Sequence, residues 1–387
     1  MSGEGTDPAE GEGLLVPVPD TGAGGYRVEV RPGALDDLGP RCRRAVGAHR
    51  YAVVADERVA DHYAERALRS LEGAGQPAEL FTFPEGEASK SRERWGRLTD
   101  RMLEAGLSRD AAVVALGGGV TGDLAGFVAA TYMRGVPVVQ VPTSLLAMLD
   151  SSVGGKTGVN TPAGKNLVGA FHHPEHVLVD PEVLATLDRR HLRAGLAEAV
   201  KAAAIADGEL FAWMEERAGA LAAGEIGPTT ELVRRAVAIK ADVVARDPEE
   251  AGRRQILNFG HTLGHALEST AGLSGLHGEA VAAGMVLEAR RGEETGVTRP
   301  GTADRLRSLL EACGIPPWPL ERHDPREVLE AARRDKKARE GGVRLVLLEN
   351  IGNVSRADGR AWTHPVDEDR LLSWLPRALR SEQPSTD

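Results

Sequence analysis

Residues 111–123 read Ala-Ala-Val-Val-Ala-Leu-Gly-Gly-Gly-Val-Thr-Gly-Asp, an apolar run followed by three consecutive glycines. The run predicts a buried strand, and Asp123–Ala130 predicts the helix that follows it. Glycines at such a turn let a pyrophosphate approach the backbone, and the helix N-terminus presents free N–H groups to it. The spacing is neither GxGxxG nor a P-loop, so on its own this segment indicates dinucleotide binding or a simple tight turn.

Short apolar runs alternate with helix-length segments on both sides of this turn, from Tyr26 to about Asp180. Strands that alternate with helices predict a largely parallel α/β sheet with crossover helices. A further helix is predicted at Ser91–Ala105. The predicted strands are Tyr26–Val30, Tyr51–Ala55, Glu79–Phe83, Ala112–Leu116, Val136–Val141 and Val177–Val179.

From about Thr186 the sequence changes to long stretches rich in Ala, Leu and Glu, which predict a mostly α-helical second domain. We expect an α/β domain over residues 25–185 and a helical domain over residues 186–380. Residues 1–24, which are acidic and rich in Gly and Pro, and residues 381–387 predict disordered tails. Within the second domain we predict helices at Ala194–Ala206, Thr230–Ala245 and Gly278–Glu294, and a late strand at Val343–Leu348.

Composition excludes several classes of function. A chain of 387 residues is long enough for two domains with sizeable cores. Its net charge of −10 argues against nonspecific nucleic-acid binding. The two cysteines, Cys42 and Cys313, are far apart, which excludes a disulfide scaffold and a thiolate-rich zinc site. No apolar run reaches the length of a membrane span. We therefore expect a cytoplasmic protein without a membrane or nucleic-acid partner.

Lysine is scarce, since only seven of the 47 basic residues are lysines. Lysine carries a compact charge with a tunable pKa, whereas the guanidinium of arginine is planar, rigid and always protonated. This pattern indicates that lysine is kept where arginine cannot replace it. The seven are Lys90, Lys156, Lys165, Lys201, Lys240, Lys336 and Lys337.

The segment between Arg134 and Asn166 gathers groups suited to an anionic ligand. Lys156 and Lys165 each follow a glycine, and Asp150 adds a carboxylate that could hold a hydroxyl. Two Gly-Lys pairs with an arginine and an amide favour a phosphate or carboxylate pocket over a polar surface loop.

Three histidines predict a metal site. His261 and His265 share one face of a predicted helix at i and i+4, and His277 follows across a loop. In a chain almost without cysteine, zinc must be bound by histidine and carboxylate, and three protein ligands with an open position mark a catalytic site. The HExxH pattern is absent, which excludes that class of metalloprotease. Glu198 and Lys201 share another helix face and, taken alone, are typical of a surface ion pair.

Three other polar segments allow two interpretations each. Asp56 ends a predicted strand, where its carboxylate could reach ribose hydroxyls. Residues 84–90 follow another strand, and a polar turn that caps the next helix explains them equally well. Asp335-Lys336-Lys337 is either a solvated helix end or, given how scarce lysine is, a substrate contact.

Taken together and in this order, these segments resemble the motifs of the 3-dehydroquinate synthase family. That family belongs to the sugar-phosphate cyclases, which are related more distantly to glycerol-type dehydrogenases. The resemblance runs from about Tyr26 to Asn353. It rests on residues 117–123, 131–135, 142–150, 154–157, 164–167, 257–265 and 335–337.

The resemblance implies an α/β N-terminal NAD-binding domain and a mostly α-helical C-terminal metal-binding domain. It implies NAD and Zn²⁺ (or Co²⁺) as cofactors, with Glu198, His261 and His277 as metal ligands. One departure is visible, because Arg58 stands where the family often has Asn; this concerns only the adenosine end of NAD. Arg134 matches a residue that reaches the neighbouring subunit's site, which implies a homodimer.

The resemblance also implies two sets of contacts. The implied NAD contacts are Asp56, Glu87, Lys90, Gly118, Gly119, Val120, Asp123, Thr143, Ser144, Lys156, Lys165, Thr186 and Leu187. The implied catalytic and substrate contacts are Asp150, Lys156, Lys165, Asn166, Lys201, Lys240, Arg254, Asn258, His265 and Lys336.

The implied reaction converts a small sugar phosphate, 3-deoxy-D-arabino-heptulosonate 7-phosphate, to 3-dehydroquinate and phosphate. Its steps are oxidation, β-elimination, reduction, ring opening and aldol closure, as the second reaction of the shikimate pathway. Arg254, Asn258 and Lys336 favour a substrate with a carboxylate, because cyclases of substrates without one are expected to lose them.

Four alternatives stay open at this point. They are an aminodehydroquinate synthase, another sugar-phosphate cyclase of secondary metabolism, an NAD-dependent polyol dehydrogenase and a non-catalytic NAD-binding regulator. The Glu/His/His set disfavours the dehydrogenase, since related dehydrogenases typically use Asp/His/His. The intact motifs disfavour the regulator.

Overall fold

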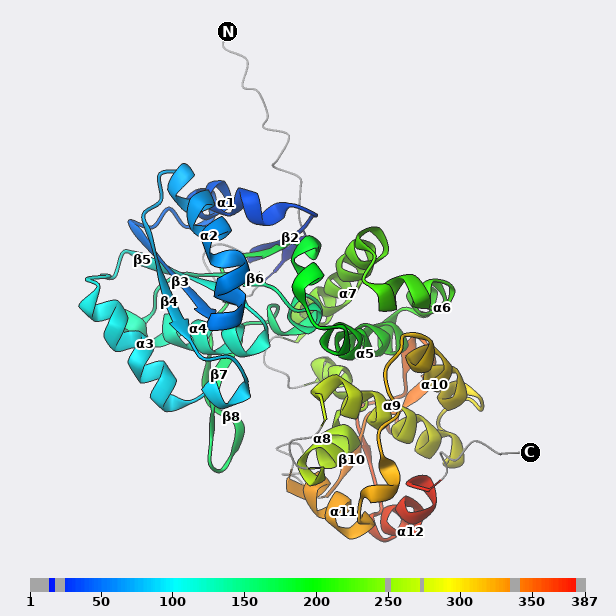
Figure 1. The fold of residues 1–387 in the computed structure, drawn as a ribbon. Coiled ribbons are helices and arrows are strands. Elements are labelled where there is room, and N and C mark those ends of the chain that lie inside the picture. The colour runs from blue at the N-terminus through cyan, green and yellow to red at the C-terminus, as the bar shows by residue number, and fades with distance from the viewer. Residues whose placement is uncertain (1–13, 18–24, 248–251, 272–274, 335–341, 381–387) are drawn as a thin grey trace. The chain divides into compact units, whose positions relative to one another are not determined.

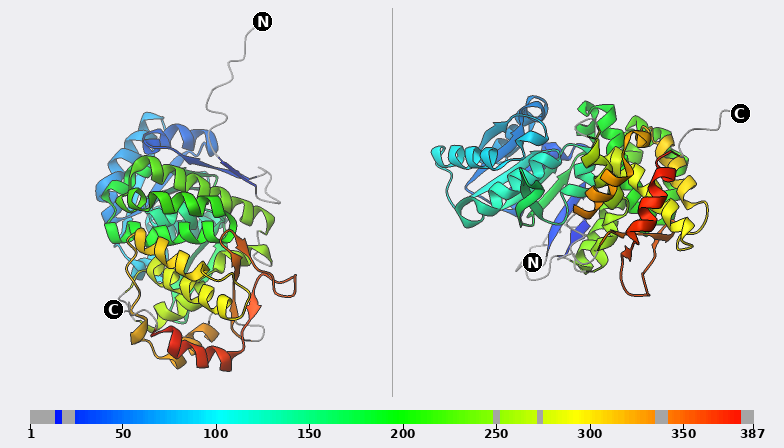
Figure 2. Two further views of the ribbon diagram at one scale, coloured as in Figure 1. Left: turned by 90° about the vertical axis from the view of Figure 1, so that its right-hand side faces the viewer. Right: turned by 90° about the horizontal axis from the view of Figure 1, so that it is seen from below.

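The computed structural model describes residues 14–17, 25–247, 252–271, 275–334 and 342–380. The chain forms two compact units, Met1–Leu187 and Asp188–Asp387 (Figures 1 and 2). Asp335, Lys336 and Lys337 lie outside the described residues, as do the tail 381–387 and most of the tail 1–24. Within the described part of the chain, no helix is long and apolar enough to cross a membrane.

The first unit is built on a seven-stranded sheet with the strand order β1-β2-β9-β6-β5-β3-β4. All neighbouring strands are parallel except β1, which runs antiparallel to β2. The six strands predicted from apolar runs are therefore confirmed. The strands are β1 (Leu14–Val16), β2 (Tyr26–Val30), β3 (Arg50–Asp56), β4 (Ala78–Phe83), β5 (Ala111–Gly117), β6 (Val138–Pro142) and β9 (His176–Val179).

Helices bury the sheet, as a continuous apolar strand requires. Every residue of β5 is buried. The helix that follows it, α4, is buried from Leu124 to Ala129 because it packs against β5 and also against a second layer. The helices of this unit are α1 (Leu38–Ala45), α2 (Glu57–Gly73), α3 (Arg92–Glu104) and α4 (Gly119–Thr131).

That second layer is a hairpin which the sequence patterns do not predict. Its antiparallel strands are β7 (Lys156–Thr161) and β8 (Gly164–Phe171), and β7 packs on α4. Gly126 of α4 permits this contact, because a Cβ there would lie 2.5 Å from Thr157 Cγ2. The hairpin carries Lys156, Lys165 and Asn166, so these residues lie on a sheet and not on a loop.

Two expectations are corrected in detail. The prediction of a disordered tail over residues 1–24 is wrong for Leu14–Val16, whose apolar side chains let them pair with β2, and Val16 is fully buried. The late strand predicted at Val343–Leu348 is two short strands, β10 (Arg344–Leu345) and β11 (Leu348–Asn350). They pair with β13 (His364–Pro365) and β12 (Asn353–Val354), respectively.

The second unit is helical, and the helices predicted there are confirmed. Helices α5 and α9 are buried over most of their length, and α9 packs against α5, α8 and α10. Leu263, Leu287, Trp318 and Trp374 belong to the apolar core around α8, α9, α11 and α12. The helices are α5 (Arg189–Ala206), α6 (Gly208–Ala223), α7 (Ile226–Arg246), α8 (His261–Thr270), α9 (His277–Glu294), α10 (Thr302–Ala312), α11 (Pro325–Arg334) and α12 (Glu368–Ala378).

Glycines bring α9 into direct contact with the backbones of α5 and α8. A Cβ on Gly278 would lie 2.0 Å from Ala194 O of α5, and one on Gly284 would lie 2.0 Å from Gly260 O. Gly260 itself has a φ of 76°, which favours glycine. No larger residue fits these contacts without moving a helix, so they fix the distances between the three helices.

Candidate active site

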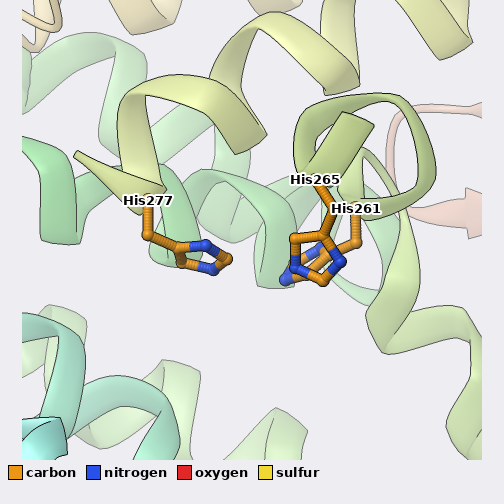
Figure 3. Close-up of side chains that lie close together, drawn as sticks. All are labelled: His261, His265 and His277. Atoms are coloured by element: carbon orange, nitrogen blue, oxygen red, sulfur yellow. The ribbon is translucent and has the colours of Figure 1, made fainter. Parts of the chain in front are cut away.

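A carboxylate and two imidazoles converge inside the second unit. Glu198 lies on α5, while His261 and His277 are the first residues of α8 and α9. Glu198 Oε1 is 3.7 Å from His261 Nε2 and 3.8 Å from His277 Nε2. Figure 3 shows the ring of His277 directed toward those of His261 and His265. Segments far apart in the sequence therefore bring three metal-ligating atoms together.

This arrangement fits a divalent cation. Glu198 is buried, and its Oε2 lies 2.5 Å from Lys201 Nζ, which balances the charge of the carboxylate. Its Oε1 has no hydrogen-bond partner among the described residues. A buried carboxylate oxygen without a partner is costly. Ligands at about 2.1 Å from a tetrahedral zinc ion lie about 3.4 Å apart, close to the separations seen here.

Each imidazole is held through its other nitrogen. His261 Nδ1 lies 3.1 Å from the carbonyl oxygen of Phe259, and His277 Nδ1 lies 3.1 Å from Glu268 Oε2. A carbonyl and a carboxylate only accept, so both Nδ1 atoms carry the proton and donate. In the neutral form of each ring, Nε2 is thereby left with a lone pair that faces Glu198. Burial lowers the pKa of His277, but Glu268 and Glu198 outweigh it and the net pKa is raised.

His265 lies beside these candidate ligands, one turn after His261 on α8. Its ring centroid is 5.1 Å from that of His261 and 5.4 Å from that of His277. Ligand atoms of all three histidines lie within 4.8 Å of one another. The three histidines predicted from spacing therefore form one group, which includes the predicted substrate contact His265.

Two buried glutamates of α9 fix the helix starts that carry the histidines. Glu279 accepts from the Leu276 N–H (3.1 Å) and forms a two-point ion pair with Arg190 of α5 (2.6 and 2.8 Å). Glu288 accepts from the N–H groups of Gly260 (2.9 Å) and Leu263 (3.3 Å) at the start of α8. Both carboxylates accept hydrogen bonds from backbone N–H groups that have no acceptor within the helix, because they lie at its start.

Further predicted substrate contacts of the second unit lie on neighbouring segments. Lys240 on α7 and Arg254 and Asn258 on the turn η7 (Arg253–Asn258) are all buried, and α5, α7 and η7 pack against one another. Asp247 Oδ2 accepts from the N–H groups of Gly252 (2.8 Å) and Arg254 (2.7 Å) and so holds the entry to η7. Lys336 lies outside the described residues.

In the first unit, predicted NAD contacts gather at the carboxyl end of the sheet, between the neighbouring strands β3 and β5. From β3 the chain continues to β4 on one side, and from β5 it continues to β6 on the other side. Such a switch point is where open α/β sheets bind ligands. Asp56 ends β3, caps α2 through Val59 N–H (2.9 Å) and accepts from Thr121 Oγ1 (3.3 Å). Gly118 and Gly119 form the turn into α4, and Val120 lies in its first turn.

Other predicted NAD contacts surround the same turn. The Thr143 N–H donates to Gly117 O (2.9 Å), and a Cβ on Gly118 would lie 3.2 Å from Ser144 Oγ. Lys90, buried after β4, forms an ion pair with Asp123 of α4. Thr186, next to Leu187 at the end of the unit, shares a 2.8 Å hydrogen bond with Tyr63.

The remaining predicted residues lie on the hairpin or on nearby turns. Asn160 of β7 donates to Glu87 Oε1 (2.6 Å), and its Oδ1 accepts from the Asn166 N–H (3.0 Å). Asn160 thus connects a predicted NAD contact with a predicted substrate contact. Asp150 lies in the helical turn Ala147–Ser151, and Arg134 ends the turn Tyr132–Arg134 with a φ of 69°.

Comparison with known proteins shows the family to which the chain belongs. The family profile for the 3-dehydroquinate synthase N-terminal domain matches residues 80–194, and the C-terminal profile matches residues 195–338. The 3-dehydroquinate synthase of Symbiobacterium thermophilum is 48% identical over 331 residues, which cover 85% of this chain and 92% of that protein. The chain belongs to the 3-dehydroquinate synthase family. The resemblance seen in the sequence motifs is confirmed.

Solved structures of sugar-phosphate cyclases share the fold. A 2-deoxy-scyllo-inosose synthase complexed with carbaglucose-6-phosphate, NAD⁺ and Co²⁺ matches with a TM-score of 0.85 and 25% identity over 94% of this chain and 99% of that one. The 2-epi-5-epi-valiolone synthase of Streptomyces hygroscopicus subsp. jinggangensis 5008, with NAD⁺ and Zn²⁺ bound, matches with a TM-score of 0.82 and 31% identity. That match covers 92% of this chain and 97% of the neighbour.

Sequence reasoning missed the residues that support the site. Glu268 follows His261 by seven positions, so the two share a helix face, and this spacing could have revealed it. Glu279 could have been found as an acidic residue in the first turn after His277. Asn160 and Glu288 carry no comparable signal, because Glu87 and the start of α8, to which they respectively bond, are distant in sequence.

Proposed function

We propose that this member of the family is a 3-dehydroquinate synthase, which converts 3-deoxy-D-arabino-heptulosonate 7-phosphate to 3-dehydroquinate and phosphate. The observation that carries the proposal is the buried Glu198 Oε1, which faces two imidazole nitrogens in a chain 48% identical to an enzyme of that name. The cofactors bound by the two cyclase neighbours support NAD and Zn²⁺ or Co²⁺ here.

In the second unit, Glu198, His261 and His277 would hold the divalent cation. Lys201 orients the Glu198 carboxylate and balances its charge through the 2.5 Å ion pair. Arg254 and Lys240 would bind the substrate carboxylate. Asn258, His265 and Lys336 would contact the phosphate.

In the first unit, the turn Gly118–Val120 and the side chains of Asp56 and Asp123 would hold NAD. Lys156, Lys165 and Asn166 would provide cationic and amide contacts for the substrate, and Asp150 would hold a hydroxyl. When bound, NAD supplies a reversible hydride acceptor and the cation supplies a Lewis acid. The protein's own residues chiefly position the leaving phosphate beside an acidic C–H.

A phosphate-release assay tests the function. We expect one phosphate per turnover with the heptulosonate phosphate, catalytic amounts of NAD sufficing and no steady rise in NADH absorbance. The amino analogue of the substrate, which has the same carboxylate and phosphate, is assayed beside it. Stoichiometric NADH would instead identify a dehydrogenase, and a strong preference for the amino analogue would identify the aminodehydroquinate reaction.

Replacing Arg254 with alanine is expected to weaken recognition of the substrate carboxylate. Loss of one partner of a buried ion pair typically costs about 2–5 kcal/mol, so kcat/KM should fall by at least about 30-fold, mainly through KM. Arg253→Ala is the matched control, because that neighbouring side chain lies partly exposed beside Asp242 and Trp362. Steady-state kinetics that are equal for the two variants would contradict this role of Arg254.

The proposal extends to assembly and location. We infer a homodimer in which Arg134 contacts the partner's site, and a cytoplasmic enzyme, as the family resemblance implies. Light scattering of the purified chain would test the dimer, since a monomeric mass in the active enzyme would exclude it.

A further inference from the structure

We propose that Glu268 is a positioning residue of the metal centre, which holds His277 in the tautomer and orientation needed to ligate the cation. Glu268 Oε2 lies 3.1 Å from His277 Nδ1, whereas His277 Nε2 lies 3.8 Å from Glu198 Oε1. The two nitrogens of one ring therefore face two different carboxylates. The inference rests on the proposed function only in that a divalent cation occupies the group Glu198, His261 and His277.

The hydrogen bond between Glu268 and His277 determines which nitrogen of the imidazole can bind a metal. A neutral imidazole carries one proton, and only the nitrogen without it can donate a lone pair to a metal. An ionised carboxylate accepts hydrogen bonds but does not donate them, so Glu268 draws the proton to Nδ1. Without Glu268, His277 could also carry its proton on Nε2 or turn its ring, and both changes remove the ligand atom from Glu198.

The two histidine ligands differ in what holds them. His261 donates to the carbonyl of Phe259, two residues earlier in its own backbone, and no side-chain substitution removes that acceptor. His277 depends on a side chain from another helix. Glu268 and His261 lie two turns apart on α8, so this one short helix supplies a ligand and also orients the ligand on α9.

Partial burial of both side chains protects the hydrogen bond between Glu268 and His277 from water. The Glu268 side chain is 19% exposed and that of His277 is 35% exposed, so water competes only partly for either group. A carboxylate acceptor forms a stronger hydrogen bond than a carbonyl and makes the imidazole a better donor. Loss of such an outer partner typically lowers metal affinity about 10- to 100-fold.

The test uses the full-length protein with Glu268→Ala, Glu268→Gln and the matched control Ser269→Ala. Ser269 lies next to Glu268 and its hydroxyl bonds to Ala266 O within its own helix. Zn²⁺ affinity is measured by competition with a chromophoric chelator, and the Co²⁺-substituted protein is examined by visible absorption. Circular dichroism confirms that each variant is folded.

We expect Glu268→Ala to bind Zn²⁺ about 10- to 100-fold more weakly and to change the Co²⁺ spectrum. Glu268→Gln should recover most of the affinity, because its amide oxygen still accepts from Nδ1. Ser269→Ala should match the wild type. Wild-type affinity and spectrum in Glu268→Ala would overturn the inference, as would a Gln variant no better than the Ala variant.

The outcomes separate this inference from the proposed function. If the wild type binds Zn²⁺ in one equivalent and Glu268→Ala binds it equally well, the positioning role fails and the proposed function stands. If the wild type binds neither Zn²⁺ nor Co²⁺, both fail.

Discussion

Alanine at position 277 is expected to abolish both metal binding and phosphate release. His277 is one of two imidazoles that face Glu198 Oε1, and its removal leaves a carboxylate and one histidine. Two protein ligands hold zinc poorly, since catalytic sites normally provide three. The loss of affinity should exceed the roughly 10- to 100-fold effect of removing an outer partner. Metal analysis after dialysis and the phosphate-release assay measure the two effects.

His265→Ala is the matched control, because it removes an imidazole from the same group of side chains. This variant should keep one equivalent of metal yet turn over slowly, as expected of a substrate contact. The reverse result, with metal lost from His265→Ala and retained by His277→Ala, would replace the proposed ligands with a set that includes His265. Added Zn²⁺ or Co²⁺ should restore activity to chelator-treated wild type but not to His277→Ala.

Gly278→Ala is expected to have the second large effect, although it adds one methyl group. That methyl would lie 2.0 Å from Ala194 O, which belongs to the backbone of α5 and cannot move aside by itself. Helix α9 must therefore shift away from α5, and His277, one residue earlier, must move away from Glu198. Overpacking of this kind costs about 1–3 kcal/mol, and we expect a lower melting temperature together with weakened Zn²⁺ binding.

Gly219→Ala is the matched control for Gly278→Ala, because it adds the same methyl group at a position where no other atom is close. Gly219 lies within α6, and no atom would come within 4 Å of its added Cβ. Alanine in an open helix position is more stable than glycine by about 0.5–1 kcal/mol, so this variant should melt at the same or a higher temperature. A Gly278→Ala protein with wild-type melting and Zn²⁺ affinity would show that α9 adjusts without disturbing the site.

The sequence predicts the sheet because its strands are covered on both faces and therefore read as uninterrupted apolar runs, as in Ala112–Leu116. The hairpin β7–β8 has no such pattern. Its strands contain Gly158 and Gly169 and expose most of β8, so packing against α4 stabilises them. Leu14–Val16 is three residues long, and only its pairing with β2 reveals a strand.

The histidines of the candidate site are predictable because their spacing follows helix geometry. The position of Glu198 beside these histidines cannot be predicted in this way, because an i, i+3 pair of Glu198 with Lys201 is typical of any helix surface. Its burial, and its approach to residues more than 60 positions later, depend on how α5 packs against α9. Long-range packing of this kind leaves no local pattern, which is why Glu288 and Asn160 were also missed.

The glycine contacts of α9 have a consequence for protein engineering. Where two backbones touch, as at Gly284 and Gly260, no side-chain rotation can widen or narrow the gap. The metal-binding part of the site is thus built to one fixed size. Directed evolution toward new sugar phosphates should leave these glycines unaltered and randomise positions on η7 such as Arg254 and Asn258, which we propose as substrate contacts. Libraries built in this way would vary the choice of substrate while retaining the metal.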